Sequence, residues 1–542
     1  MLHSIRLHID ITETAQIMNN KDYSLRGWCL LLAVIIGVAA LSFIPSANVF
    51  GLETEKVDIL SDLRPANDTE AAAVPVDYVA DFEHLESQLA TVNEDKDSLD
   101  KSTPARLEWI AIKQSTPQHE MLHSDMIKPQ RSSKAVPIED YDTAEITRFD
   151  RFVERLIDGK DVRIAFLGDS YIEGDIISQD LRDQLQRTFG GRGVGFVPCA
   201  IPFEILRKSV RRSVSGWTAY SLMNTGAIPA SYRDKFFMSG YLAAGHRGST
   251  AHWQSTDLFP TLDSCTRARV LITSRDESDI EIVVNDTLKH KFNLPGAEYV
   301  RELYVEAPVK SLKMNILSGN VLCHGASLEG GRGVIVDNMS IRGNSGYTIF
   351  GSGAAVNRQV DKLWDYDLII MEYGLNAMQP GQRDFTKYQG KLCDMIAYVK
   401  RCFPNAAILI LGVSDRCVKG EGGWRSMNSV EIMTPFQRRA SQLEGVAFWD
   451  MGKVIMSYGG IKGFVENGWA AHDYIHINFK GGARVAKPLG DAIIQRAYDL
   501  LVEREGKIAD MVYPLGLSPE GLYERYEQRR KEEPLPLILD IE

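Results

Sequence analysis

Residues 162–170 (VRIAFLGDS) join a short apolar run to a glycine, a carboxylate and a hydroxyl. The run 162–167 is apolar and β-branched in character, which predicts a buried strand. Apolar residues at helical spacing predict a helix before it, over 143–157, and a second helix follows over 175–189. The order helix, strand, loop, helix is typical of the start of an α/β domain.

Further along the chain the pattern changes twice. Short runs of alternating polarity fill 200–333, which is the spacing of an all-β sandwich. Helices and buried strands then alternate again, with strands at 366–372, 407–411 and 446–450 and helices at 384–401, 435–444 and 482–503. We therefore predict an α/β domain that is interrupted by an inserted β domain.

The composition of the 542 residues is that of a globular protein, with 44% hydrophobic and 25% charged residues. It excludes a wholly disordered chain, a collagen-like chain and a protein with many membrane spans. The net charge of −11 argues against a nucleic acid as partner. The cysteines include no CxxC pair, which argues against a structural zinc site.

One segment, 27–44 (GWCLLLAVIIGVAALSFI), is uncharged and nearly all apolar, and its length is at the lower limit for crossing a bilayer. Lys21 and Arg26 precede it, so we expect a cytoplasmic N-terminus, 1–26, and an exported body. This predicts a single-pass anchor in the inner membrane with the body in the periplasm. Two alternatives are a signal peptide cleaved near residues 46–47 and a buried core helix.

The chain thus divides into segments of different character. Residues 45–140 are polar, with proline and charge clusters, and predict a linker or stalk that is largely disordered, or else a small domain of unknown type. The α/β domain takes 141–199 and 334–504, and the β insert takes 200–333. Residues 505–542 are a charged tail that contains proline, or else include a surface helix.

Three groups of polar residues stand where nucleophilic catalysis would need them. Ser170 follows a strand and precedes a helix, a place that exposes its Oγ beside helix N–H groups. Asp473 and His476 are three residues apart, so the carboxylate can hold the imidazole Nδ1–H and leave Nε2 as a base. Asn376 follows a strand, and its amide could donate to an oxyanion.

Each of these groups also has a structural interpretation. Ser170 is suited to capping a helix, and Asn376 to a strand-to-loop turn. His472 and His476 could form a metal-binding pair, although a third ligand and the glutamate of a zincin motif are missing. The two histidines could equally be surface or core residues without a chemical role.

Taken in order, these residues resemble the sequence blocks of SGNH (GDSL-type) hydrolases. Gly168-Asp169-Ser170, Gly374-x-Asn376 and Asp473-x-x-His476 are similar to the first, third and fifth blocks. The second block in that superfamily is a glycine after a strand, and Gly343 matches it.

The closer similarity is to exported peptidoglycan O-acetylesterases of that superfamily. Residues 164–198 resemble their first block and its helix. The insert at 200–333 resembles their carbohydrate-binding-like β module in position and pattern. The resemblance implies a three-layer α/β sandwich around a parallel central sheet, and it leaves the segments before 141 and after 504 uncovered.

The resemblance also implies a function. It is that of a serine esterase of the cell envelope that removes O-acetyl groups from a polysaccharide, peptidoglycan above all, without metal or cofactor. Ser170 would be the nucleophile, His476 the base, and Asp473 the residue that orients the imidazole. The N–H groups of Ser170 and Gly343 and the side chain of Asn376 would form the oxyanion hole.

Two rival functions fit the same sequence. Related proteins transfer acetyl groups onto sugars outside the cytoplasm, and a glycan-binding envelope protein without catalysis would also explain the β insert. The loop 421–425 (EGGWR) offers an aromatic ring and a cation to a sugar, or is an ordinary surface loop.

Overall fold

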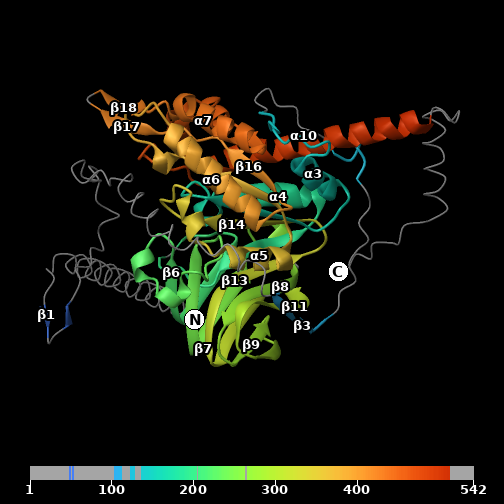
Figure 1. The fold of residues 1–542 in the computed structure, drawn as a ribbon, viewed down its shortest axis with the longest axis vertical. Coiled ribbons are helices and arrows are strands. Elements are labelled where there is room, and N and C mark those ends of the chain that lie inside the picture. Colours follow the sequence, from blue (N-terminus) through green and yellow to red (C-terminus); the bar gives the residue numbers. More distant parts are fainter. Residues whose placement is uncertain are drawn as a thin grey trace, which may run out of the picture. The chain divides into compact units, whose positions relative to one another are not determined.

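The computed structural model describes residues 48–49, 52–53, 103–112, 122–127, 136–203, 205–262, 265–420 and 422–512 (Figure 1). The chain divides into two units, Met1–Asp81 and Phe82–Glu542. In the first unit, β1 (Asn48–Val49) and β2 (Leu52–Glu53) pair antiparallel. The predicted membrane segment 27–44 lies outside the described residues, and no helix within them combines the length and apolar character that a bilayer crossing needs.

The second unit contains a five-stranded parallel sheet with the strand order β14-β4-β15-β16-β19. Its strands are β4 (Val162–Gly168), β14 (Val334–Ser340), β15 (Tyr366–Glu372), β16 (Ala407–Leu411) and β19 (Ala447–Trp449). Every residue of these strands is buried, as in parallel sheets with helices on both faces. The strands predicted from apolar runs are thus present in the predicted places.

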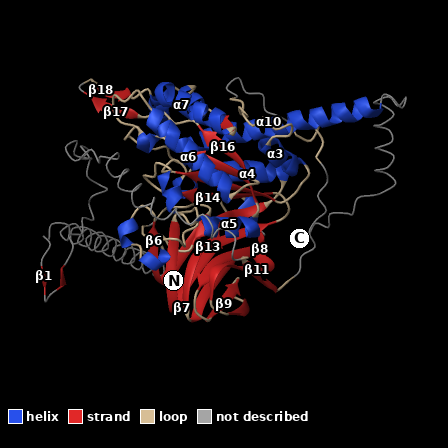
Figure 2. Ribbon diagram, in the orientation of Figure 1, coloured by secondary structure: helices blue, strands red, loops and turns tan. Residues whose placement is uncertain are grey.

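Two groups of helices flank this sheet (Figure 2). Helices α3 (Arg148–Ile157), α4 (Ser178–Phe189) and α10 (Phe479–Val512) form the first group, and α5 (Ala354–Trp364), α6 (Thr386–Cys402) and α7 (Ser429–Glu444) form the second. The short helices α8 (Met451–Met456) and α9 (Gly460–Glu466) follow β19. Apolar side chains of the helices and the sheet form one continuous buried core.

Two helices begin later than the sequence predicts. α3 begins at Arg148 instead of 143, because the Thr147 hydroxyl accepts a hydrogen bond from the Asp150 N–H at 3.0 Å and caps the helix there. α4 begins at Ser178 instead of 175, because Asp175 has a left-handed backbone with φ 71°. Left-handed backbone cannot continue a right-handed helix.

Ten strands form a second sheet in this unit, in the order β10-β9-β12-β7-β13-β8-β11-β3, with β5 beside β13 and β6 beside β7 (Figure 1). The strands are β3 (Ala105–Ile110), β5 (Arg192–Pro198), β6 (Val210–Ser221), β7 (Tyr241–Ser255), β8 (Cys265–Ser274), β9 (Ser278–Val284), β10 (Leu288–Leu294), β11 (Ala297–Val309), β12 (Ser311–Ser318) and β13 (Asn320–Gly330). Their apolar side chains form a second core.

This sheet differs from the predicted insert in three respects. Its strands are hydrogen-bonded into one sheet instead of a two-sheet sandwich, because the long strands β7 and β13 each pair with three others. β5 precedes the predicted boundary at 199/200 and pairs with β13. β3 belongs to the predicted linker 45–140, yet it pairs in parallel with β11.

Other parts of the predicted linker and tail are also structured. The Val136 carbonyl accepts a hydrogen bond from Trp449 Nε1 at 3.0 Å, and Glu139 forms two backbone hydrogen bonds with Phe448 in β19. α10 continues past the predicted helix end at 503 to Val512. The predictions of a disordered linker and of a helix end at 503 are therefore wrong for these residues, because tertiary contacts order segments whose composition is polar.

A buried ion network joins the two sheets. Arg163 in β4 places Nε 2.7 Å from Asp337 Oδ2 in β14, and Nη1 2.7 Å from Glu329 Oε2 in β13. The guanidinium also lies over the Trp364 ring, 3.7 Å from its centroid. Burial opposes ionisation of Glu329, but Arg163 and two further guanidinium groups hold the pKa of Glu329 well below its usual range.

We expect the substitution Arg163→Met to lower the free energy of unfolding by about 3–5 kcal/mol, because it removes the cation that is hydrogen-bonded to the buried Asp337 carboxylate. The Asp337 carboxylate would then accept hydrogen bonds from uncharged donors only. Denaturant-induced unfolding measures the change. Arg187→Met is the matched control, since Arg187 pairs with Asp183 on an exposed helix face and should cost below about 1 kcal/mol. Equal losses in the two variants would contradict the expectation.

Candidate active site

Four loops that are far apart in the sequence meet at one edge of the parallel sheet. Loops 169–172, 341–346 and 373–376 follow β4, β14 and β15, and the loop 472–476 precedes α10. Because β14, β4 and β15 are parallel neighbours, their carboxyl ends lie side by side. This edge of an α/β sheet is where ligands bind.

Ser170, His476 and Asp473 form a chain of hydrogen bonds at this edge. Ser170 Oγ lies 2.9 Å from His476 Nε2, and His476 Nδ1 lies 2.7 Å from Asp473 Oδ2. The side chains of His476 and Asp473 are 46% and 45% exposed, so solvent reaches the imidazole. The arrangement lets the imidazole take the proton of the hydroxyl while the carboxylate holds the other ring nitrogen.

This geometry decides between the structural alternatives. The N-cap of α4 is Ile177, and Ser170 faces His476 instead of capping that helix. Both ring nitrogens of His476 are hydrogen-bonded, so neither is left for a metal shared with His472. Over the part of the chain that the structure describes, no group of three or more His, Cys, Asp and Glu residues is placed to hold a metal ion.

Asp473 is held in its ionised form by hydrogen bonds. Its Oδ1 accepts from the N–H groups of Ile475 at 2.9 Å and His476 at 3.0 Å. Partial burial opposes ionisation, but the bond with the His476 ring and these two N–H donors lower the pKa of Asp473 to about 2. A negative charge therefore stands behind the imidazole at neutral pH.

A hairpin supports the loop that carries Asp473 and His476. It consists of β17 (Cys417–Gly420) and β18 (Gly423–Ser426). Tyr474 has a left-handed backbone with φ 57°, its ring stacks on Trp424 with the centroids 4.8 Å apart, and its carbonyl accepts from the Cys417 N–H at 3.0 Å.

Tyr171 holds the same loop from the side of the nucleophile. Its hydroxyl donates to the Ile475 carbonyl at 2.7 Å and accepts from Ser414 Oγ at 2.7 Å. Sequence reasoning missed Tyr171, and it considered Trp424 as a sugar contact or a surface residue. No spacing rule links residues 304 and 50 positions apart, so these contacts become visible in the tertiary structure alone.

The predicted oxyanion donors lie on the loops beside Ser170. Gly343 has a left-handed backbone with φ 75°, in which any other residue would be strained. Within the described chain, the N–H groups of Ser170 and Gly343 have no protein acceptor. Asn376 Nδ2 donates to Asp169 Oδ2 at 2.7 Å and to the Asn344 carbonyl at 3.3 Å. The longer bond is the one that an oxyanion could replace.

We expect Asn376→Ala to lower kcat about 10²–10³-fold with little change in KM, since a donor to the oxyanion acts in the transition state. Initial rates of ester hydrolysis over a range of substrate concentrations measure both constants. Because Asn376 also binds Asp169, thermal unfolding of the variant is recorded alongside. If kcat falls by less than about ten-fold in a folded variant, Asn376 is excluded as an oxyanion donor.

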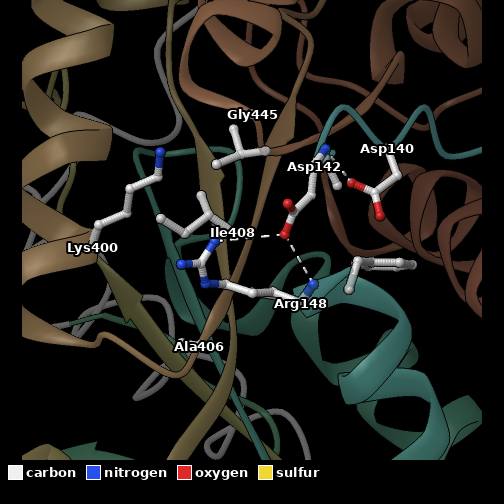
Figure 3. Close-up of a pocket in the computed structure, with 11 residues that line it drawn as sticks. Asp140, Asp142, Arg148, Lys400, Ala406, Ile408 and Gly445 are labelled. Carbon is white, nitrogen blue, oxygen red and sulfur yellow. Dashed lines mark hydrogen bonds and ion pairs between the residues drawn. The ribbon is translucent and has the colours of Figure 1, made fainter. Parts of the chain in front are cut away.

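A separate hollow lies away from these groups (Figure 3). Its lining includes Asp140, Asp142, Arg148, Lys400, Ala406, Ile408 and Gly445. The hollow reaches the amino end of β16, which is the edge of the sheet opposite to Ser170, and no predicted site residue lines it. Asp142 and Arg148 pair across it, with Nη1 3.5 Å from Oδ2.

No model of a protein family and no curated protein matches the chain. Among solved structures, a peptidoglycan O-acetylesterase matches with a TM-score of 0.55 and 22% identity, over 67% of this chain and 99% of that chain. A family two carbohydrate esterase from Cellvibrio japonicus matches with a TM-score of 0.22 and 11% identity, over 53% of this chain and 98% of that chain. A GDSL-like lipase from Parabacteroides merdae has a TM-score of 0.23 and 16% identity, over 31% of this chain and 74% of that chain.

The likeness to the peptidoglycan O-acetylesterase shows a shared fold. The α/β fold that the resemblance implies is thus shared with a solved structure.

Proposed function

We propose that this chain is a serine esterase that hydrolyses O-acetyl esters on a polysaccharide, with peptidoglycan as the preferred substrate. The observation that carries the proposal is the hydrogen-bonded chain from Ser170 through His476 to Asp473 at the carboxyl edge of the sheet. Gly343 and Asn376 stand on the neighbouring loops. The shared fold with a peptidoglycan O-acetylesterase supports the class of substrate.

The acylation step uses each of these residues in turn. Ser170 Oγ attacks the acetyl carbonyl while His476 Nε2 takes its proton, and the ionised Asp473 stabilises the imidazolium. The negative charge on the former carbonyl oxygen is met by the N–H groups of Ser170 and Gly343 and by Asn376. When the tetrahedral intermediate collapses, His476 returns the proton to the leaving sugar hydroxyl.

The deacylation step regenerates the enzyme with a water molecule. His476 takes a proton from water, the hydroxide attacks the acetyl-serine, and acetate leaves as Ser170 regains its proton. The exposure of the His476 side chain, at 46%, gives water a path to the imidazole. An open imidazole supports hydrolysis over transfer, since a transferase gains by keeping water out.

The location in the cell envelope is part of the proposal. Anchoring through 27–44 would hold the body in the periplasm, where the glycan is found. The acidic net charge of −11 also favours a body that stands off anionic lipid.

Acetate release by the full-length chain in detergent tests the proposed function. A chain that began at residue 140 would lack β3, the edge strand that pairs with β11, so the complete chain is the proper sample. O-acetylated sacculi should release acetate, whereas the same sacculi after alkaline de-O-acetylation should release none. Acetylated xylan, offered at the same ester concentration, should react more slowly.

Three outcomes would contradict the proposal in different ways. Faster acetate release from xylan would show that the preferred substrate is a glycan other than peptidoglycan. Acetyl groups that accumulate on an added glycan acceptor instead of in water would identify a transferase. Retained glycan binding with no acetate release from any ester would identify a binding protein.

A further inference from the structure

Glu372 is a buried carboxylic acid beside the nucleophile loop to which the mechanism above gives no role. It is the last residue of β15 and pairs in register with Gly168, the residue before Asp169. Glu372 and Asp169 are both 0% exposed. The carboxyl groups of Asp169 and Glu372 are therefore both buried next to the loop that carries Ser170.

The two carboxyl groups differ in their hydrogen bonds. Asp169 Oδ1 accepts from the Tyr171 N–H at 2.9 Å, and Oδ2 accepts from Asn376 Nδ2 at 2.7 Å. Within the described chain no hydrogen-bond donor has suitable geometry toward either oxygen of the Glu372 side chain, and the groups that act on this side chain are the carboxyl and the backbone of Asp169. Two carboxyl groups can share a hydrogen bond between their side chains when one of them keeps a proton.

No arginine or lysine of the described chain is among the groups that act on the pKa of Glu372. The titratable groups that face the two carboxyl groups are Tyr171, Tyr373, Tyr388 and His476. Burial, followed by the nearby charge of Asp169, raises the pKa of Glu372 well above its usual range. Burial also raises the pKa of Asp169, but its two N–H donors favour the ionised form on that residue.

We propose that Glu372 is a positioning residue that stays protonated and donates its O–H to Asp169, so that the pair carries a single negative charge. Asp169 can then accept from the backbone next to Ser170 and from the Asn376 amide at the same time. Through these two bonds Glu372 sets the place of the nucleophile and of one oxyanion donor. The inference rests on the proposed role of Ser170 as a nucleophile.

Loss of this proton would place two like charges in contact without solvent. Repulsion would push Asp169 away from Asn376 and Tyr171 and disturb both the nucleophile loop and the oxyanion donor. Activity should therefore fall on the alkaline side of neutral pH, where Glu372 would lose its proton.

Two substitutions separate the proton from the shape of the side chain. Glu372→Gln keeps an N–H donor toward Asp169 and has no proton to lose, whereas Glu372→Leu fills the space without a donor. Asp361→Asn is the matched control, because Asp361 lies near the other end of β15, where it accepts from the Tyr366 N–H. Partial burial raises the pKa of Asp361 to about 7, so it provides a second acid with a raised pKa away from the site.

The first measurement is infrared difference spectroscopy of the full-length protein at neutral pH. The absorption of a protonated carboxyl group that belongs to Glu372 should be present in the wild type and lost in Glu372→Gln. If this substitution removes no such absorption, Glu372 is ionised and the proposal is overturned.

The second measurement is the rate at which a fluorophosphonate probe labels Ser170, which needs no glycan substrate. Glu372→Gln should stay within about three-fold of the wild type at neutral pH and lose the alkaline decline, whereas Glu372→Leu should label about ten-fold more slowly. Asp361→Asn should label like the wild type. An unchanged alkaline decline in Glu372→Gln, or equal rates in the Gln and Leu variants, would overturn the positioning role.

The two measurements keep this inference apart from the proposed function. Sacculi that release no acetate would end the peptidoglycan assignment, while the carboxyl absorption and the labelling rates would still decide the role of Glu372. Normal acetate release with equal Gln and Leu variants would leave the esterase intact and remove this role.

Discussion

Replacement of Ser170 by alanine is expected to abolish ester hydrolysis, with kcat falling about 10⁶-fold. The reason is that Ser170 Oγ is the atom that lies 2.9 Å from His476 Nε2 and that would form the acyl-enzyme. The residue is partly exposed at the edge of the sheet and fills no core space. The melting temperature should therefore stay within a few degrees of the wild type, and glycan binding should persist.

Acetate release from O-acetylated sacculi and labelling by a fluorophosphonate both measure this loss. His476→Ala is the companion variant, and the double variant Ser170→Ala/His476→Ala should be no slower than either single variant, since residues that act as a unit are not additive. Residual activity of Ser170→Ala above about one per cent of the wild type would remove Ser170 as the nucleophile.

Asp473→Asn is expected to lower kcat about 10⁴-fold while the fold is retained. The isosteric amide can still accept the N–H groups of Ile475 and His476, but it cannot carry the charge that faces Nδ1. Without that charge the imidazolium is no longer stabilised, and the ring can adopt the tautomer that cannot act as a base toward Ser170.

The pH dependence of the wild type gives a check on this role. Because the folded-state pKa of Asp473 is lowered to about 2, its charge is complete at neutral pH and is lost as the pH falls through that value. Any decline in activity between pH 7 and about pH 5 must then come from protonation of a group other than Asp473.

His472→Ala is the matched control for Asp473→Asn. His472 is exposed on the same loop, and it has no place in the proposed mechanism. It should keep kcat within about two-fold of the wild type, within the range of surface substitutions. A large loss in His472→Ala that zinc restores would revive the metal-pair interpretation. A loss below about 100-fold in Asp473→Asn would contradict the orienting role of Asp473.

Much of the α/β domain follows from local pattern alone. The runs 162–167, 366–372 and 407–411 are apolar over their whole length, and such runs are buried on both faces wherever they pack. Their order with the intervening helices specifies a parallel sheet. Parallel strands bring their carboxyl ends together. The sequence pattern therefore predicts that Ser170 and Asn376 lie at the same edge of the sheet.

The sandwich and linker predictions failed for a common reason. β3 has an ordinary half-buried strand pattern, but it lies in a polar segment and pairs with β11, which begins almost 200 residues later. β7 and β13 continue past the length of one pairing partner, so each pairs with three other strands and connects them into one sheet. Pairing between strands so far apart in the sequence depends on which edge strand of the sheet is still unpaired once the other strands have formed.

The sequence alone predicts the nucleophile, the base, the acid and the oxyanion donors, because their chemistry requires particular side chains at short spacings from strand ends. Folding decided which groups surround them. Arg163 in an apolar strand, Trp424 in a glycine-rich loop and Glu372 at a strand end have no local explanation. Each is explained by a partner more than 45 residues away, namely Asp337, Tyr474 and Asp169. Burial then sets their charges, since the cost of an ion in the interior depends on all its neighbours.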